Sequence, residues 1–508
     1  MSFKCSHMLG NAAEMLFNTA SRVSDRPAVI DASAGSETSY DCLRSDTLAI
    51  LAQLRRHCVA PGERVAILLP RGAASAAAYF GVLAAGAAAV PVSEALKPRQ
   101  IDYILRHAGA RCVLSAGRLR ELLPKDIPAL DVEELLNDKA DHAPTGPVAR
   151  TGGDLAHLIY TSGSTGMPKG VAVSHGNVWA GTSAVVDYLA INKADRIASL
   201  LPFSFDYGLN QLLCSVATGA TLVVERSPVP QRIVESLFAF EVSVLPAVPP
   251  LWLQLLTSER FGAERLGRLR AMTNTGGHLP KEAVCRLRHA QPEADLILMY
   301  GLTEAFRSAY LSPRLVDAKP GSIGRAIPGA EVLVLREDGT PCAAGEVGEL
   351  VHRGPTVTLG YWNDPAATAE RFRPNPLHPA GMPDVERVVF SGDLVYRDAA
   401  GDHFFVGRRD SLIKSLGHRV SADEVCEALY ASGEIVEAII STEPDAIRGS
   451  AIIAHVVLDK DGDLDRLKRF AARELPRHMQ PVRFEKQASL ARTASGKHDP
   501  RAMAVPAE

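Results

Sequence analysis

The sequence has few cysteines, no excess of charge of one sign and no long run of strongly apolar residues. Its eight cysteines are so scattered that no two lie within four residues, which excludes a CxxC zinc site and a dense disulfide framework. The 55 Lys and Arg nearly balance the 58 Asp and Glu, for a net charge of −3. That balance argues against a broad cationic face for nucleic acid. We expect reduced thiols, a cytoplasmic location and no nucleic-acid partner.

Features of an exported or membrane protein are missing as well. The N-terminal residues lack the basic-then-apolar layout of a signal peptide. The one stretch long enough to suggest a membrane span, residues 73–92, is mostly alanine and glycine and is closed by Pro91. We predict instead a core helix over 73–84, a stop at Gly86 and a buried strand over 88–92, and no membrane span.

Apolar runs typical of buried strands alternate with helical patterns over about the first 330 residues, as at 64–69, 155–160 and 296–300. This alternation predicts an α/β fold of layered subdomains. Two hairpins should follow, one over 331–351 that turns at Asp338-Gly339, and one over 388–406 that turns near Gly401. The large N-terminal domain should therefore include a β-rich subdomain.

The last hundred residues predict a separate small α+β domain. Ser421 with Glu424 forms a capping-box pattern, strands are expected over 435–440 and 451–458, and Pro476 should end a helix over 464–475. The short polar segment 407–410 leaves little linker slack. We therefore predict a core domain over 1–408 and a mobile lid domain over 409–508, with a hinge near Asp410.

The strongest chemical signal is the decapeptide 161–170, Thr-Ser-Gly-Ser-Thr-Gly-Met-Pro-Lys-Gly, which follows an apolar strand. Its glycines let backbone amides approach an anion, its hydroxyls can donate to phosphate oxygens, and its lysine adds charge. It is not a Walker A loop, because Lys169 is followed by Gly170 rather than Ser or Thr. We expect this loop to bind phosphate.

This decapeptide resembles the signature loop of the adenylate-forming superfamily, which contains acyl-CoA synthetases, adenylation domains of nonribosomal peptide synthesis, and luciferases. Four more segments match the family's motifs in order and spacing: 300–304 (Tyr-Gly-Leu-Thr-Glu), 391–394 (Ser-Gly-Asp-Leu), 407–417 and 494–497 (Ala-Ser-Gly-Lys). The resemblance covers nearly the whole chain and is greatest to a bacterial branch of AMP-forming acyl-CoA ligases.

The resemblance implies roles for individual residues. ATP would be bound by Thr161, Ser162, Gly163, Ser164, Thr165, Lys169, Gly276, Gly277, Tyr300, Gly301, Thr303, Asp393 and Arg408. Catalysis would depend on Lys497, Thr165, Thr303 and Glu304. The residue types suit these roles: Tyr300 can stack on adenine, Asp393 can accept ribose hydroxyls, and Glu304 is a hard oxygen ligand for the Mg²⁺ that ATP brings. Gly276 and Gly277 should leave room for a flat base or substrate.

The implied reaction joins a carboxylic acid to ATP, giving an acyl-adenylate and pyrophosphate, and then transfers the acyl group to a thiol with release of AMP. Lys497 would stabilise the charge of the first step from a swinging C-terminal domain. The acceptor thiol would be CoA, or the phosphopantetheine of an acyl or peptidyl carrier protein. A remote alternative is a nucleotide-binding module without catalysis, which loss of Lys169, Glu304 or Lys497 would favour; all three are present.

The acid pocket is expected to contain Phe205, Asp206, Tyr207, Asn210, Thr275 and Arg307. In amino-acid-activating relatives, an Asp at the place of Asp206 binds the substrate amine. A buried carboxylate needs a cation nearby, and Arg307 is the other candidate. Pairing with Arg307 would favour an acid without an amine, whereas an Asp206 that faces an empty pocket would favour an amino acid. The sequence leaves both open, with acyl-CoA ligase ahead of an amino-acid or carrier-protein ligase.

Overall fold

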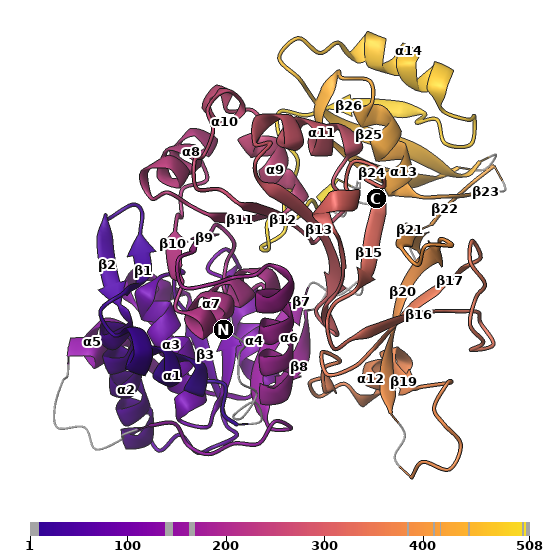
Figure 1. Ribbon diagram of the computed structural model, residues 1–508. Coiled ribbons are helices and arrows are strands. Elements are labelled where there is room, and N and C mark those ends of the chain that lie inside the picture. Colours follow the sequence, from indigo (N-terminus) through magenta and orange to yellow (C-terminus); the bar gives the residue numbers. More distant parts are fainter. Residues whose placement is uncertain are drawn as a thin grey trace.

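A computed structural model of the chain describes residues 10–137, 146–161, 168–383, 386–409, 412–416, 418–445, 448–499 and 502–503. Two sheets with their helices form the body of the molecule, a β-rich part lies beside them, and a small C-terminal domain lies at the upper right (Figure 1). This architecture confirms the predicted fold class. Asp410 lies outside the described residues, so the domain boundary at 408–409 and the hinge stay predictions.

The first sheet is parallel at its centre, with the strand order β2-β1-β10-β9-β11-β12-β13-β14-β15. Its strands are β1 (Pro27–Asp31), β2 (Ser36–Ser39), β9 (Arg196–Ser199), β10 (Thr221–Val224), β11 (Val244–Ala247), β12 (Ala271–Asn274), β13 (Asp295–Leu302), β14 (Phe306–Leu311) and β15 (Ser322–Ala326). Every residue of β10, β11 and β12 is buried, as expected for parallel strands covered on both faces.

The second sheet has the order β18-β8-β7-β4-β3-β5-β6. Its strands are β3 (Arg64–Leu68), β4 (Ala88–Pro91), β5 (Ala110–Ser115), β6 (Ala129–Asp131), β7 (Leu155–Thr161), β8 (Lys169–Ser174) and β18 (Gly360–Tyr361). The alanine-rich stretch forms the predicted buried helix, α3 (Ala73–Ala84), followed by Gly86 at φ 75° and by strand β4. That prediction is confirmed.

Helices lie between the two sheets and connect them. Helix α3 contacts β1 of the first sheet and β3 and β4 of the second; α6 contacts β7 and β8, and its neighbour α7 contacts β9 and β10. The helices of this body are α1 (Glu14–Val23), α2 (Tyr40–Arg56), α4 (Pro98–Ala108), α5 (Val132–Asn137), α6 (His175–Tyr188), α7 (Asp206–Thr218), α8 (Pro230–Ala239), α9 (Pro249–Leu255), α10 (Glu259–Ala263) and α11 (Lys281–Ala290). Helix α7 begins at Asp206 and therefore carries much of the expected acid pocket.

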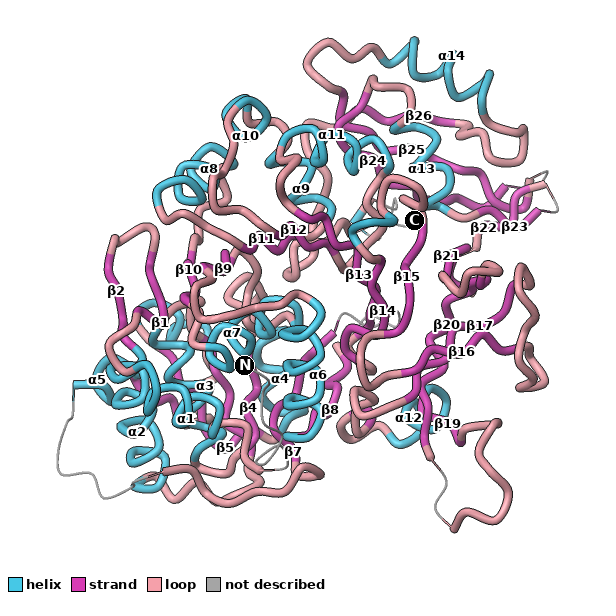
Figure 2. Tube along the Cα trace, in the orientation of Figure 1, coloured by secondary structure: helices cyan, strands magenta, loops and turns pink. Residues whose placement is uncertain are grey.

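Both predicted hairpins are present in the β-rich part, which continues the first sheet through β15 (Figure 2). Its elements are β16 (Glu331–Leu335), β17 (Val347–Arg353), α12 (Pro365–Arg371), β19 (Phe372–Pro374), β20 (Arg387–Arg397) and β21 (His403–Arg408). The hairpin turns contain Gly339 at φ 82° and Gly401 at φ 91°, left-handed values that glycine adopts without strain.

The C-terminal domain has one sheet of the order β23-β22-β25-β24, with β26 paired to β25. Its elements are β22 (Ile413–Ser415), β23 (His418–Val420), α13 (Ala422–Tyr430), β24 (Ile435–Asp445), β25 (Gly449–Leu458), α14 (Leu464–Glu474) and β26 (Arg483–Lys486). The predicted capping box is wrong. Ser421 is the N-cap of α13, but its side chain makes no capping hydrogen bond. Glu424 is exposed and does not fold back onto the helix end.

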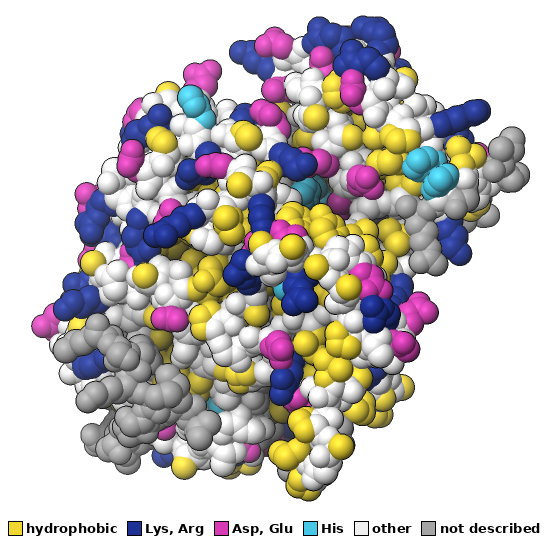
Figure 3. All heavy atoms as spheres, turned by 45° about the vertical axis from the view of Figure 1, so that its right-hand side comes forward, with side chains coloured by type: hydrophobic (Ala, Val, Ile, Leu, Met, Phe, Trp, Pro, Cys, Tyr) yellow, Lys and Arg dark blue, Asp and Glu magenta, His cyan; other side chains and the backbone are white. Residues whose placement is uncertain are grey.

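The described surface fits the near-neutral charge. Positive and negative side chains alternate over most of the face in Figure 3, with a gathering of Lys and Arg at the top of the molecule, where α14 lies. Within the described ranges, no helix combines the length and apolar character that crossing a membrane requires.

Candidate active site

A tight turn near the C-terminus presents Lys497. The amide of Thr493 donates to the Lys497 carbonyl (2.8 Å), and the amide of Gly496 donates to the Thr493 carbonyl (2.9 Å), with Gly496 at φ 81°. Glu437 of β24 anchors the turn on both sides, through Arg492 (2.6 Å) and His498 (3.4 Å). The turn is thereby held to the C-terminal sheet and projects the lysine away from it.

The Lys497 side chain reaches into the N-terminal domain. Its ammonium lies 5.0 Å from the centre of the Phe205 ring. A Cβ added to Gly276 would be 2.8 Å from Lys497 Cε, so the space beside this glycine, predicted for a base or substrate, is taken by the lysine. Burial holds the pKa of Lys497 below its ordinary value, and the charges of Asp206 and Glu304 act in the opposite direction. The lysine is thus a desolvated cation stabilised by two carboxylates.

A second set of contacts surrounds Glu304. Tyr361 donates its hydroxyl to Glu304 Oε1 (2.5 Å), and Thr358 donates both its amide and its hydroxyl to the Glu304 carbonyl (2.9 Å each). The ammonium of Lys169 lies 5.2 Å from the centre of the Tyr361 ring. Tyr361 therefore contacts both the lysine of the decapeptide and the glutamate of the second motif. The sequence analysis did not identify this tyrosine.

Tyr300, Asp393 and Arg408 form a third group. Tyr300 donates its hydroxyl to Asp393, and Arg408 Nε lies 3.3 Å from Asp393 Oδ1. The Tyr300 ring stacks on His352, with ring centres 5.9 Å apart. Burial and the charge of Asp393 raise the pKa of Tyr300, so its phenol stays protonated and donates. Three residues taken from three separate motifs thus meet, as a nucleotide site requires.

The decapeptide is described only at its ends. Thr161 ends β7 and pairs with Lys169, which begins the antiparallel β8. Ser162, Gly163, Ser164 and Thr165 lie outside the described residues, so their predicted phosphate contacts stay predictions. The close approach of the neighbouring strand explains the glycine at position 301. A Cβ on Gly301 would lie 2.3 Å from the Phe306 carbonyl oxygen.

A cavity opens between α6, α7 and strands β7 and β8. Its polar wall includes Asp206 and Thr303, and its apolar wall includes Leu209, Leu213 and Phe306. Asp206 accepts a hydrogen bond from the Tyr207 amide (2.8 Å) at the start of α7. Because Asp206 both lines this cavity and acts on Lys497, the cavity adjoins this lysine. It is the candidate acid pocket.

Asp206 and Arg307 do not form an ion pair. Arg307 instead donates to Asn210 Oδ1 (2.7 Å), and its guanidinium lies 4.7 Å from the centres of both the Tyr207 and Phe306 rings. Thr275 is buried at the end of β12, beside Gly276. Of the two cations considered for Asp206, a substrate ammonium and Arg307, the structure therefore removes Arg307. Lys497, which the sequence analysis did not consider for this role, is a cation on which Asp206 acts.

The C-terminal domain is held against the body at a second point. Glu427 of α13 lies 2.8 Å from His278 Nε2 and accepts from the Lys281 amide (3.2 and 3.3 Å). The sequence analysis missed both Glu427 and Glu437, because each acts through a contact distant in sequence.

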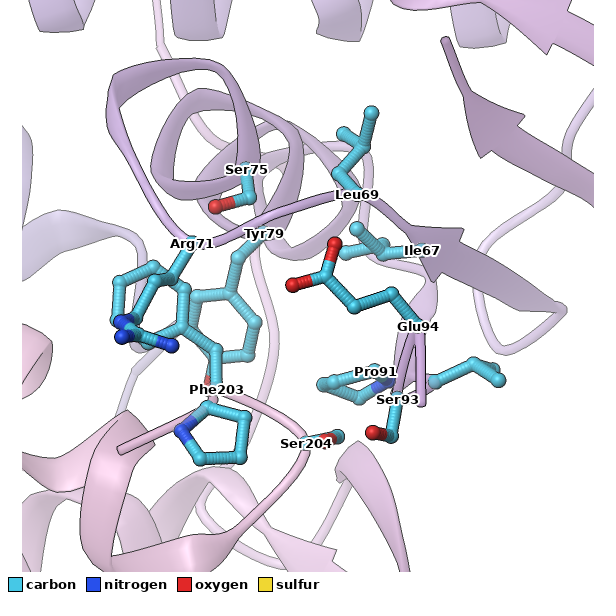
Figure 4. A pocket seen from close by; sticks show the side chains of 12 residues that line it. Ile67, Leu69, Arg71, Ser75, Tyr79, Pro91, Ser93, Glu94, Phe203 and Ser204 are labelled. Carbon is cyan, nitrogen blue, oxygen red and sulfur yellow. The ribbon is translucent and has the colours of Figure 1, made fainter. Parts of the chain in front are cut away.

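A different cavity is lined by the 202–204 loop and by residues that include Arg71, Tyr79 and Glu94 (Figure 4). Arg71 donates to the Ser199 carbonyl (3.2 Å) and also bonds the Glu225 carbonyl. Burial lowers the pKa of Arg71 to about 10, and Glu94 opposes that shift. None of the predicted nucleotide-binding residues lines this cavity, so we separate it from the candidate active site.

No group of three or more His, Cys, Asp and Glu within the described part of the chain has the geometry of a metal site. Glu304 fits a different arrangement, in which one carboxylate contacts a Mg²⁺ that is otherwise held by phosphate oxygens. Its Tyr361 bond uses Oε1, so Oε2 is the oxygen available to such an ion.

Residues 16–362 match the family model described as AMP-binding enzyme, and residues 424–497 match the one described as AMP-binding enzyme C-terminal domain. The chain is 29% identical over 484 residues to a dimodular nonribosomal peptide synthase of Bacillus subtilis, covering 92% of this chain and 20% of that protein. It spans at most 10% of the other peptide synthases among its first relatives.

Two further relatives match over nearly their whole length. An L-proline–[L-prolyl-carrier protein] ligase of Pseudomonas fluorescens is 29% identical, with 97% of this chain and 98% of that protein covered. An o-succinylbenzoate-CoA synthetase of Bacillus subtilis, solved with its acyl-adenylate intermediate, has a TM-score of 0.84 at 26% identity, with 97% and 98% covered.

Proposed function

The chain belongs to the AMP-binding enzyme family, and on this premise we propose that it activates a carboxylic acid with ATP and transfers the acyl group to a thiol. The observation that carries the proposal is the placement of Lys497. The lysine lies beside Gly276 and Phe205, under the charges of Asp206 and Glu304, at one end of the candidate acid pocket. The remote alternative of a binding module without catalysis gives no reason to bury a lysine there.

In the first step, a carboxylate oxygen of the acid attacks the α-phosphorus of ATP, and the bond to pyrophosphate breaks. Lys497 supplies positive charge where negative charge accumulates on the transferring oxygens. Lys169 and Thr303 would bind phosphate, and Asp393 with Arg408 would hold the ribose. Mg²⁺ neutralises phosphate charge when bound, and Glu304 is the residue that would hold it. The protein therefore acts by positioning and by charge stabilisation, with no nucleophile of its own.

In the second step, a thiol attacks the acyl carbonyl, the mixed anhydride breaks, and AMP leaves. This step does not need Lys497 in its present place. We propose that the lid domain, residues 409–508, moves about a hinge near Asp410, away from the 1–408 core. The Glu427 contacts with His278 and Lys281 are then specific to the adenylation arrangement.

For the acceptor, we propose CoA. A carrier-protein phosphopantetheine is the second candidate, with an amino acid as the substrate. It is favoured by one observation: Asp206 lines the acid pocket and has no arginine partner, so it can accept a substrate ammonium. The acyl-CoA candidate needs no such amine, because Lys497 already compensates the charge of Asp206.

The test measures pyrophosphate release with ATP, Mg²⁺ and a panel of fatty, aromatic, dicarboxylic and amino acids. Each active acid is then incubated with CoA or with a phosphopantetheinylated carrier protein, and the thioester is identified by mass spectrometry. The proposal expects AMP and an acyl-CoA. A thioester on the carrier protein alone, from amino acids alone, would replace it by the second candidate. No pyrophosphate from any acid would refute acid activation.

A further inference from the structure

We propose that Arg307, together with Asn210, binds a second acidic group of the substrate, so that the enzyme activates one carboxylate of a dicarboxylic acid. This inference rests on the proposed acid activation and names the substrate class of the same site. It begins from a charge that the fold leaves uncompensated.

Arg307 is a buried cation without a carboxylate beside it. Arg307 is only 5% exposed, and it forms no ion pair with any described Asp or Glu. Its one hydrogen bond goes to a neutral group, Asn210 Oδ1, at 2.7 Å. Buried charges in proteins are normally paired, because desolvation costs several kcal/mol that a neutral partner offsets only in part.

Two aromatic rings hold the guanidinium in place. Its carbon lies 4.7 Å from the centres of the Tyr207 and Phe306 rings, a geometry that favours a cation. Burial raises the pKa of the Tyr207 hydroxyl, and the charge of Arg307 opposes that shift. The site is therefore arranged around a permanent positive charge.

A second unsatisfied donor lies next to that charge. Asn210 is 2% exposed, and its Nδ2 has no hydrogen-bond partner among the described residues. Arg307 has further N–H groups besides the one that binds Asn210 Oδ1. A carboxylate could accept from Arg307 through two parallel bonds and from Asn210 Nδ2 as well, which is the pairing that a planar guanidinium favours.

Arg307 does not itself line the acid pocket, but one of its neighbours does. Phe306 is both one of its aromatic neighbours and part of the pocket wall, and Asn210 follows Leu209, another wall residue, on α7. Asp206 and Thr303 of the same pocket lie near Lys497, where the reacting carboxylate must be. In the proposed complex, the first carboxylate of the acid is at Lys497 and its other end reaches Phe306, on whose far side Arg307 lies.

Phe306 separates the pocket from the guanidinium in a strained conformation. Its φ is 55°, a left-handed value that is rare for a bulky residue, and a Cβ on Gly181 of α6 would lie 2.6 Å from its ring. Such strain persists only where the surroundings enforce it, and it concentrates at ligand sites. Displacement of this ring by a substrate carboxylate would expose Arg307 to the pocket.

The test compares matched acids in ATP–pyrophosphate exchange. Each dicarboxylic acid, over a range of chain lengths, is paired with its own monoamide, which has the same shape and one charge fewer. We expect at least one diacid to exceed its monoamide by roughly 100-fold in kcat/KM, since a site built to bind a charged group strongly rejects an analogue that lacks it. Arg307→Met should remove this preference, and Arg307→Lys should retain part of it.

Each outcome decides the matter. If monocarboxylic acids or monoamides are activated as well as diacids, and Arg307→Met leaves the ratio unchanged, the inference is wrong while acid activation stands. If no acid supports exchange, the proposed function itself is wrong. Should Arg307→Met fail to fold, as judged by its melting curve, Asn210→Leu and the wild-type ratio still decide, because the preference must be present in the wild-type enzyme.

Discussion

A methyl group added to Gly276 tests whether the observed place of Lys497 is the one that catalyses adenylation. Gly276 has φ 85°, and alanine in a left-handed conformation costs about 1–2 kcal/mol. The new Cβ would lie 2.8 Å from Lys497 Cε and 3.5 Å from its Nζ. Because contacts under 3.0 Å are essentially never adopted, the flexible lysine must move.

The expected loss follows from that displacement. A shift of about 1 Å in a catalytic group can cost roughly 100-fold in rate. Gly276→Ala should therefore slow ATP–pyrophosphate exchange by about that factor. Thioester formation from a supplied acyl-adenylate should fall much less, because in the proposed mechanism Lys497 serves only the first half-reaction. Both rates can be measured on the same preparation by following pyrophosphate and thioester separately.

Gly345→Ala is the matched control. Gly345 has φ 81°, and its added Cβ would meet nothing within 4 Å, so this variant bears the same backbone cost without touching Lys497. It should lose stability like Gly276→Ala yet retain full exchange activity. Equal exchange rates in the two variants would refute the argument. Equal loss of both half-reactions in Gly276→Ala would instead assign the effect to a clash with bound nucleotide.

Three further predictions concern the same arrangement. Lys497→Ala should reduce pyrophosphate exchange by about 100- to 1000-fold and spare thioester formation from an acyl-adenylate; equal loss of both would contradict a lysine that serves one step. Asp206→Asn should move the alkaline limb of the exchange pH profile to lower pH, because Asp206 raises the pKa of Lys497 and the charged lysine is the active form; an unmoved limb would exclude that coupling. Glu427→Gln should slow exchange only about two- to fivefold, since a partly exposed pair contributes ~0.2–1 kcal/mol, with no loss in the thioester step; an equal slowing of both steps would show that the contact is not specific to the adenylation arrangement.

The sequence correctly predicted those elements of the fold that depend on a short local pattern of residues. The alanine-rich helix, its Gly86 stop and the two hairpins follow from short-range rules on alanine, on Asp-Gly and on alternating strands, and all are present. The capping box also follows from a local rule but is absent: the Ser421 side chain makes no capping hydrogen bond, and Glu424 is exposed. The predicted superfamily is confirmed by the two family matches.

The candidate site was predicted where a motif carries its own chemistry and missed where a distant residue completes it. Tyr361 lies 57 positions after Glu304, yet it donates to that carboxylate and lies against Lys169. Glu437 lies 55 positions before Arg492, yet it anchors the turn that presents Lys497. Neither residue belongs to a segment with a recognisable pattern. Contacts of this kind follow from strand pairing, such as that of β18 with β8, and not from neighbours in sequence.

Asp206 has two possible cationic partners in the active site, and their energetics can be compared. A lysine loses much of its hydration when it enters the pocket, and Asp206 with Glu304 offsets part of that cost. If a substrate ammonium also bound Asp206, one carboxylate would serve two cations, and the support of Lys497 would weaken at the moment when its charge is needed. An acid without an amine leaves Asp206 to Lys497 alone, and its second carboxylate would neutralise Arg307. A second substrate carboxylate would therefore give Arg307 a charged partner, which a neutral amino acid does not supply.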